Sequence, residues 1–173
     1  MRVESCKLTI IFALIFSTSA FAQTFSLEGG VNCLFGDLQK EFEISPYGGV
    51  GFELGLSDYT IGYLQGSYSY LNLKNNSDFH GVHQFVGRAG IELFDFLGVG
   101  ISLAGLRGDE ATPQAENYML SSNESEFGWD FRLKLNLLKF KKFTVGAKFY
   151  YDLIWTKPKN SHLLQAGLFL SLG

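Results

Sequence analysis

Apolar and polar residues alternate one by one along two long segments, and this alternation limits the possible folds more than any other feature. In the segment from Phe127 to Leu137 the apolar residues are Phe127, Trp129, Phe131, Leu133, Leu135 and Leu137. The positions between them hold Gly128, Asp130, Arg132, Lys134 and Asn136. The segment from Phe143 to Trp155 repeats the pattern. Successive side chains of a β-strand point to opposite faces, whereas a helix would mix the two sets. Both segments are therefore predicted to be strands with one apolar and one polar face.

Six further segments of roughly ten residues show the same period less strictly, so eight strands are predicted in all. They cover residues 25–33, 49–56, 61–70, 84–93, 97–104 and 164–172. In the segment 61–70, Ile61 and Tyr63 occupy positions of the polar phase. A bulge or a slipped register is therefore an open alternative for this strand.

The connections between these strands alternate in length. The first, third and fifth cover about residues 36–45, 72–79 and 107–126, and the seventh covers residues 156–161. The second, fourth and sixth are tight, at residues 57–58, 94–95 and 138–142. In an up-and-down barrel, odd connections emerge at one rim and even connections at the other. Long outer loops and short periplasmic turns are typical of outer-membrane β-barrels.

The size of the side chains indicates which face is the interior. The lumen of an eight-stranded barrel has room for only a limited volume of side chains. The polar face is rich in glycine, whereas the apolar face carries rings such as Trp129, Phe131 and Phe149 that would overfill the lumen. The sequence therefore predicts an all-β, eight-stranded antiparallel up-and-down transmembrane barrel with its apolar face towards lipid. A soluble periplasmic barrel of the lipocalin type, with the apolar face inside, is the alternative.

Nine charged residues on the polar face are predicted to form an ionic network that plugs the lumen, because desolvated charges have to be paired. They are Glu28, Glu53, Arg88, Glu92, Asp130, Arg132, Lys134, Lys148 and Asp152. Aromatic residues near strand ends are predicted to form girdles at the membrane interfaces. These girdle residues are Trp129, Phe143, Tyr151 and Trp155.

The first 22 residues predict export. Arg2 and Lys7 precede an apolar run over residues 8–16, and small residues follow up to Ala22. This order is typical of a cleavable signal peptide, here residues 1–22, and leaves residues 23–173 as the barrel domain. Cys33 would then be the single cysteine, so neither a disulfide nor a thiolate metal cluster is expected. The formal net charge of −3 provides no basic surface for nucleic acid.

With these strands and faces in place, residues 23–173 resemble the small outer-membrane barrels of the OmpA-like and opacity-protein type. The resemblance implies a porin-like barrel in the outer membrane of a Gram-negative bacterium, with a structural or surface-interaction role. We expect a monomer without cofactor or metal, with outer-membrane lipids as partners and extracellular ligands at the loops near Leu38, Asn75 and Thr112. One departure is the last residue, Gly173, where members of the group usually end in an aromatic residue.

A lipid A acyl hydrolase or acyltransferase is the enzymatic alternative, because some eight-stranded outer-membrane barrels have these activities. Ser161, His162 and Asp152 are the candidate residues. Adjacent Ser and His side chains point to opposite faces of a strand, so they could share a proton only in a loop. No catalytic site is therefore predicted. His80 and His83 are three residues apart and would also face opposite sides of a strand, so no metal site is predicted.

Overall fold

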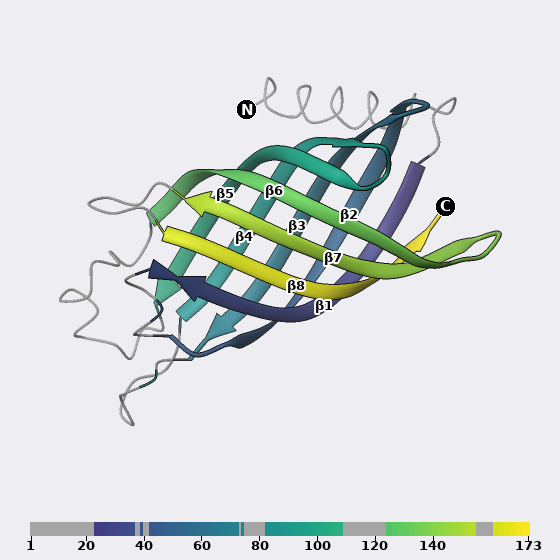
Figure 1. Cartoon of the computed structure of the whole chain (residues 1–173). Helices are drawn as coiled ribbons and strands as arrows, with labels where there is room; N and C mark the ends of the chain where they lie inside the picture. Colours follow the sequence, from purple (N-terminus) through teal and green to yellow (C-terminus); the bar gives the residue numbers. More distant parts are fainter. Residues whose placement is uncertain are drawn as a thin grey trace, which may run out of the picture.

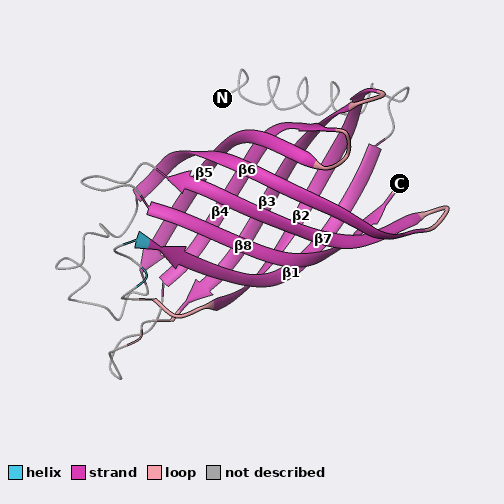
Figure 2. Ribbon diagram, viewed as in Figure 1, coloured by secondary structure: helices cyan, strands magenta, loops and turns pink. Residues whose placement is uncertain are grey.

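The computed structural model is a closed barrel of eight antiparallel strands (Figure 1). It describes residues 23–36, 39, 42–72, 74, 82–108, 124–154 and 161–173. The strands are β1 (Gln23–Phe35), β2 (Ser45–Ser57), β3 (Thr60–Leu71), β4 (Val82–Leu93), β5 (Leu97–Gly108), β6 (Glu124–Lys139), β7 (Phe143–Ile154) and β8 (Ser161–Leu172). Strands make up almost all of the coloured ribbon (Figure 2). Among the described residues, no helix is long and apolar enough to cross a membrane.

Each strand pairs with its neighbour in the sequence, and β1 closes the barrel on β8. The closing ladder runs from the pair Phe25 and Leu172 to the pair Phe35 and His162. A closed ladder leaves no strand edge unpaired, and an unpaired edge would cost several kcal/mol per group in lipid. The fold class predicted from the sequence is therefore confirmed.

The tight turns lie together at one end of the barrel, which we call the turn rim. It carries the β2–β3, β4–β5 and β6–β7 connections, and the C-terminus lies at the same end (Figure 1). The opposite end, the loop rim, carries the three longer connections and the β7–β8 connection. Residues 1–22, Trp155 and the predicted loop positions Leu38, Asn75 and Thr112 lie outside the described residues.

The β4–β5 turn has the backbone geometry that a twisted hairpin requires. Phe94 and Asp95 have φ angles of 57° and 56°, as in the two central residues of a type I′ turn. Positive φ is uncommon without glycine. The Asp95 carboxylate accepts hydrogen bonds from Lys134 at 2.5 Å and from Asn136 at 2.6 Å, so the turn is fastened to β6.

Strand β3 has one irregular step close to the position where the sequence left a bulge open. Its pairing with β4 is continuous from Thr60 to Leu71, whereas its pairing with β2 shifts between Gly55 and Ser57, opposite Ile61 and Thr60. A further shift among the described strands lies between Asn136 and Leu138 in the β6–β7 ladder. Tyr63 is inward and 5% exposed. Its place in the polar phase therefore reflects a ring in the lumen and not a slipped strand.

Candidate functional site

The two faces of the barrel wall differ sharply in chemistry. Large apolar side chains on the outside are exposed, for example Phe131 at 48% and Phe85 at 54%. The nine charged residues predicted for the lumen are all inside and at most 8% exposed: Glu28, Glu53, Arg88, Glu92, Asp130, Arg132, Lys134, Lys148 and Asp152. The interior is thus the site where the polar chemistry of the chain is concentrated.

Arg88 is the centre of the network near the middle of the barrel. Its guanidinium donates to Asp152 from Nε at 3.0 Å and from Nη2 at 2.6 Å. It also donates to the side-chain oxygens of Gln65 at 2.6 Å and Gln165 at 2.9 Å. The Tyr150 ring lies 4.5 Å from the guanidinium carbon. Charge-assisted hydrogen bonds to a carboxylate are among the strongest in proteins, so Arg88 links β3, β4, β7 and β8 through the lumen.

Asp130 joins this centre to a second cation. Its Oδ1 lies 3.6 Å from Arg88 Nε, and its Oδ2 accepts a hydrogen bond from the Tyr63 hydroxyl at 2.5 Å. The Tyr63 ring in turn lies 4.1 Å below the guanidinium carbon of Arg132. Tyr63 therefore bridges the two arginine centres.

The second centre lies nearer the turn rim. Arg132 donates to Glu92 from Nε at 2.7 Å and also from Nη2, and it donates to Glu53 at 2.9 Å. The Lys134 ammonium donates to Glu53 at 2.8 Å, to Glu92 at 3.2 Å and to Asp95 at 2.5 Å. The oxygens of Glu53, Glu92 and Asp95 lie close enough together to hold a cation. Because the Lys134 ammonium binds all three carboxylates, this cluster is an ion-pair network.

Lys148 and Glu28 connect both centres into one network. The Lys148 ammonium lies 3.2 Å from Glu53 and 3.7 Å from Glu28. Glu28 also accepts hydrogen bonds from Tyr150 at 2.7 Å and from Gln65 at 2.5 Å. All nine charged residues are thus connected across the lumen by direct or shared contacts.

Among the described residues, four aromatic rings also fill the polar part of the lumen, namely Tyr47, Tyr63, Tyr150 and Phe169. Inward glycines on neighbouring strands make room for them. A Cβ added at Gly167 would collide with the Tyr47 hydroxyl, and one added at Gly146 would collide with the Phe169 ring. Sequence analysis missed Tyr47 and Phe169, although glycines in the inward phase of adjacent strands were a usable signal for such rings.

An apolar layer lies inside the barrel at the loop rim, and sequence analysis missed it. We call it the apolar cap; it consists of Leu34, Phe42, Leu71, Val86, Ala104, Ile154 and Leu163. Phe42 comes from the connection between β1 and β2 and is 4% exposed. The next residue, Glu43, donates its backbone N–H to the Asn72 carbonyl at 2.9 Å, which ties this connection to the end of β3. Apolar side chains thus follow the polar interior at the loop rim.

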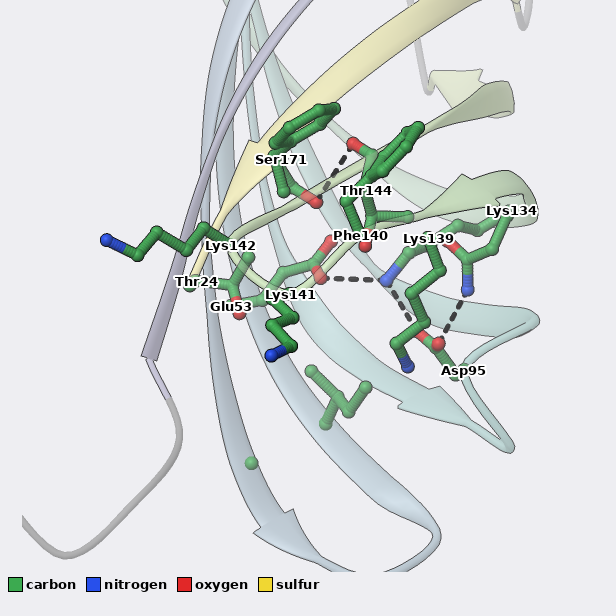
Figure 3. Close-up of a pocket in the computed structure, with 15 residues that line it drawn as sticks. Thr24, Glu53, Asp95, Lys134, Lys139, Phe140, Lys141, Lys142, Thr144 and Ser171 are labelled. Carbon is green, nitrogen blue, oxygen red and sulfur yellow. Dashed lines mark hydrogen bonds and ion pairs between the residues drawn. The ribbon is translucent and has the colours of Figure 1, made fainter.

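The turn rim opens into a cavity of about 290 Å³ (Figure 3). Its inner part is lined by Glu53, Asp95 and Lys134, which belong to the ionic network. Lys139, Lys141 and Lys142 line the cavity from the β6–β7 hairpin. The cavity and the ionic network therefore share these three side chains.

The predicted girdle residues that the structure describes all lie on the outer wall. Trp129 lies in the half of β6 that is closer to the loop rim, and Tyr151 lies on β7; both side chains are exposed. Phe143 begins β7 at the turn rim and stacks on Phe140 with ring centroids 4.4 Å apart. Trp155 lies outside the described residues.

The candidate catalytic residues are not brought together as a triad. The Asp152 carboxylate is inside the barrel and bound to Arg88. The His162 imidazole lies on the outer wall, where its Nδ1 is 2.5 Å from the Tyr151 hydroxyl. Ser161 begins β8 opposite Ile154. The barrel wall therefore separates the carboxylate from the imidazole.

Comparison with solved structures identifies the fold. Neisserial surface protein A has a TM-score of 0.67 at 11% identity over 87% of this chain and 96% of that protein. Ail of Yersinia pestis, solved with the heparin analogue sucrose octasulfate, has a TM-score of 0.56 at 10% identity, covering 88% and 99%. OprG of Pseudomonas aeruginosa has a TM-score of 0.55 at 10% identity, covering 88% and 97%.

These proteins are small eight-stranded outer-membrane β-barrels, so the resemblance predicted from the sequence is confirmed at the level of the fold. No model of a known protein family matches the chain. No curated protein matches it significantly.

Proposed function

We propose that this chain is an integral outer-membrane protein of a Gram-negative bacterium, exported by the signal peptide of residues 1–22. In this proposal the barrel is a sealed scaffold that holds surface loops at the cell exterior. It acts as a monomer without a cofactor, and its wall is solvated by outer-membrane lipid.

The contrast between the two faces of the wall carries this proposal. Burying charges in a protein interior is costly unless they are paired, and in this lumen they are paired. Exposing a continuous apolar wall to water is unfavourable for a soluble monomer, and lipid around the barrel removes that cost. A lipocalin-like carrier would instead need an apolar cavity inside, where this chain has Arg88, Arg132 and their carboxylates.

The sealed lumen is supported by two layers of side chains. The ionic network spans the middle and the turn-rim half, and the apolar cap lies at the loop rim. A permeating ion would have to break the ion pair between Arg88 and Asp152. It would also have to pass through the apolar cap together with its water of hydration. Either step is expensive in a narrow lumen, so we expect negligible conductance.

A surface-interaction role is supported by the loop rim. The longest connection is acidic and includes Asp109, Glu110 and Glu116. A direct partner of this loop would therefore be cationic, whereas an anionic surface would require bridging divalent cations. Ail was solved with a polyanion, and this acidic loop predicts a different preference.

The test combines fractionation with electrical recording. The full chain should be recovered in the outer-membrane fraction and should migrate differently on a gel when boiled and unboiled, as closed barrels do. After reconstitution into planar bilayers it should give no steady channel, beside an open porin as the positive control. Recovery in the aqueous periplasmic extract would contradict the membrane proposal. A large steady conductance would contradict the sealed lumen alone.

A further inference from the structure

The outer wall of β2, β3 and β4 is hollowed where three glycines face outward. Gly66 lies opposite Gly87, and Gly48 lies opposite Tyr68. A Cβ added at any of the three glycines would meet no atom within 4 Å. The result is a groove with a cavity volume of about 530 Å³, within the range of ~300–1,000 Å³ that is typical of ligand sites.

The borders of this groove are apolar. Val50, Tyr68 and Phe85 line it, and all three are exposed on the outer wall. The rings of Tyr68 and Phe85 lie 5.1 Å apart and mark its boundary towards the loop rim. A wall without side chains allows an extended hydrocarbon chain to contact the backbone closely, as small residues do between membrane helices. The groove therefore fits an acyl chain.

A polar cluster lies next to the groove at the loop rim. The Tyr68 hydroxyl is 2.8 Å from His83 Nδ1, and the Tyr70 ring packs edge-on against His83 with centroids 5.1 Å apart. Arg107 lies directly opposite His83 in the β4–β5 ladder, and its side chain is exposed. Residues directly opposite on one face lie about 5 Å apart at Cβ. The cluster thus brings an imidazole and two phenol groups together where the apolar wall ends, with Arg107 directly opposite His83 in the ladder.

We propose that the groove and the polar cluster together bind one phosphorylated, acylated glycolipid of the outer leaflet. One acyl chain lies along Gly48, Gly66 and Gly87, and a phosphate is held by Arg107 and His83. The guanidinium group matches phosphate in charge and in hydrogen-bond geometry, which favours an anionic headgroup at this position. The site rests on the proposed function, because it requires the loop rim to lie in the outer leaflet.

The experiment uses the full chain refolded in detergent micelles and titrated with purified bis-phosphorylated lipid A. Native mass spectrometry counts the lipids bound per barrel. Gly66→Leu fills the groove, and Arg107→Gln removes the charge. Ala147→Leu, at an outward position of β7, and Lys141→Gln, at the turn rim, are the matched controls. Every variant is first checked for heat-modifiable migration, so that only folded barrels are compared.

We expect the wild-type barrel to retain one lipid A. Arg107→Gln should weaken binding about tenfold, the size of one lost charge-assisted hydrogen bond, and Gly66→Leu should weaken it about as much because its side chain occupies the space of the acyl chain. The two controls should bind as the wild type does, and dephosphorylated lipid A should bind as weakly as lipid A binds the Arg107 variant. Three results would overturn the site. The first is that Gly66→Leu binds lipid A as tightly as the wild type does, and the second is that the wild type binds phosphatidylglycerol as tightly as lipid A. The third is that a second copy of the chain is found on the barrel in place of the lipid.

These failures differ from a failure of the proposed function. A glycolipid site can be absent from a barrel that still fractionates with the outer membrane and shows heat-modifiable migration. If the chain were a soluble periplasmic protein, it would instead be recovered without detergent.

Discussion

Arg88→Leu is the substitution that most severely tests the ionic lumen. Arg88 is 1% exposed, and its guanidinium donates to Asp152, Gln65, Ser67 and Gln165. Leucine fills part of the space but leaves Asp152 as a buried carboxylate without its main cation. Breaking a buried ion pair by removing one partner costs about 3–5 kcal/mol. We expect a loss of this size in the free energy of unfolding.

The measurement is urea unfolding of the refolded barrel in micelles, followed by the fluorescence of its tryptophans and by heat-modifiable migration. The double variant Arg88→Leu with Asp152→Leu removes both charges, so it should recover on the order of 2 kcal/mol relative to Arg88→Leu alone. Arg107→Leu, an exposed arginine at the loop rim, should change stability by less than about 1 kcal/mol. If Arg88→Leu stays within about 0.5 kcal/mol of the wild type, buried charge pairing does not stabilise this lumen as argued.

Three further substitutions follow from the same packing. Gly146→Ala should destabilise the barrel by about 1–3 kcal/mol, because its methyl group would overlap the backbone carbonyl of Leu135 and the Phe169 ring, whereas outward Gly87→Ala should be neutral; equal unfolding curves would disprove this steric account. Lys134→Met should cost about 3 kcal/mol because it leaves Asp95 without its cation beside Glu53 and Glu92, and Lys141→Met at the turn rim serves as the control; a neutral Lys134 variant would show that Arg132 and Lys148 neutralise this cluster without Lys134. His162→Ala should leave the lipid A acyl pattern of the cell unchanged in mass spectra, and the loss of a His162-dependent deacylated species would instead support an enzyme.

Much of the fold could be predicted because the two faces of the wall differ in polarity. Strands β6 and β7 have an exposed apolar face on one side and a polar lumen on the other, so their alternation is nearly strict and their faces are unambiguous. The structure extends β6 to Glu124–Lys139, beyond the predicted Phe127–Leu137, and ends β7 at Ile154. Strand ends are hard to predict because the difference in polarity between the two faces becomes smaller at the rims.

The packing of the lumen was harder to predict, because it depends on contacts across the barrel. The sequence placed Arg88 and Asp152 on the polar face, but their pairing across strands β4 and β7 follows from the register and tilt of the closed sheet, which no local pattern encodes. Tyr63 did not fit the expected pattern because aromatic rings were expected outside. Gly90, opposite it on β4, and Gly100, on β5, provide the space that allows a ring inside.

The apolar cap shows a second limit of alternation. Leu34, Val86 and Leu163 occupy the inward phase near the loop rim, although inward positions elsewhere are polar. Periodicity alone predicts whether a side chain points inward or outward. It does not predict whether the inward position lies in the polar or the apolar part of the lumen. The cap became evident only when the strands were aligned in the barrel.

The orientation of the wall can be tested most directly with Trp129, one of the two tryptophans of the chain. In a Trp155→Phe variant, Trp129 is the only fluorophore of its kind, and its side chain lies on the outer wall, 45% exposed. In vesicles of lipids brominated along the acyl chains, its fluorescence should be strongly quenched, while aqueous iodide should have little effect. Quenching by iodide without quenching by the brominated chains would place this face in water and contradict the account.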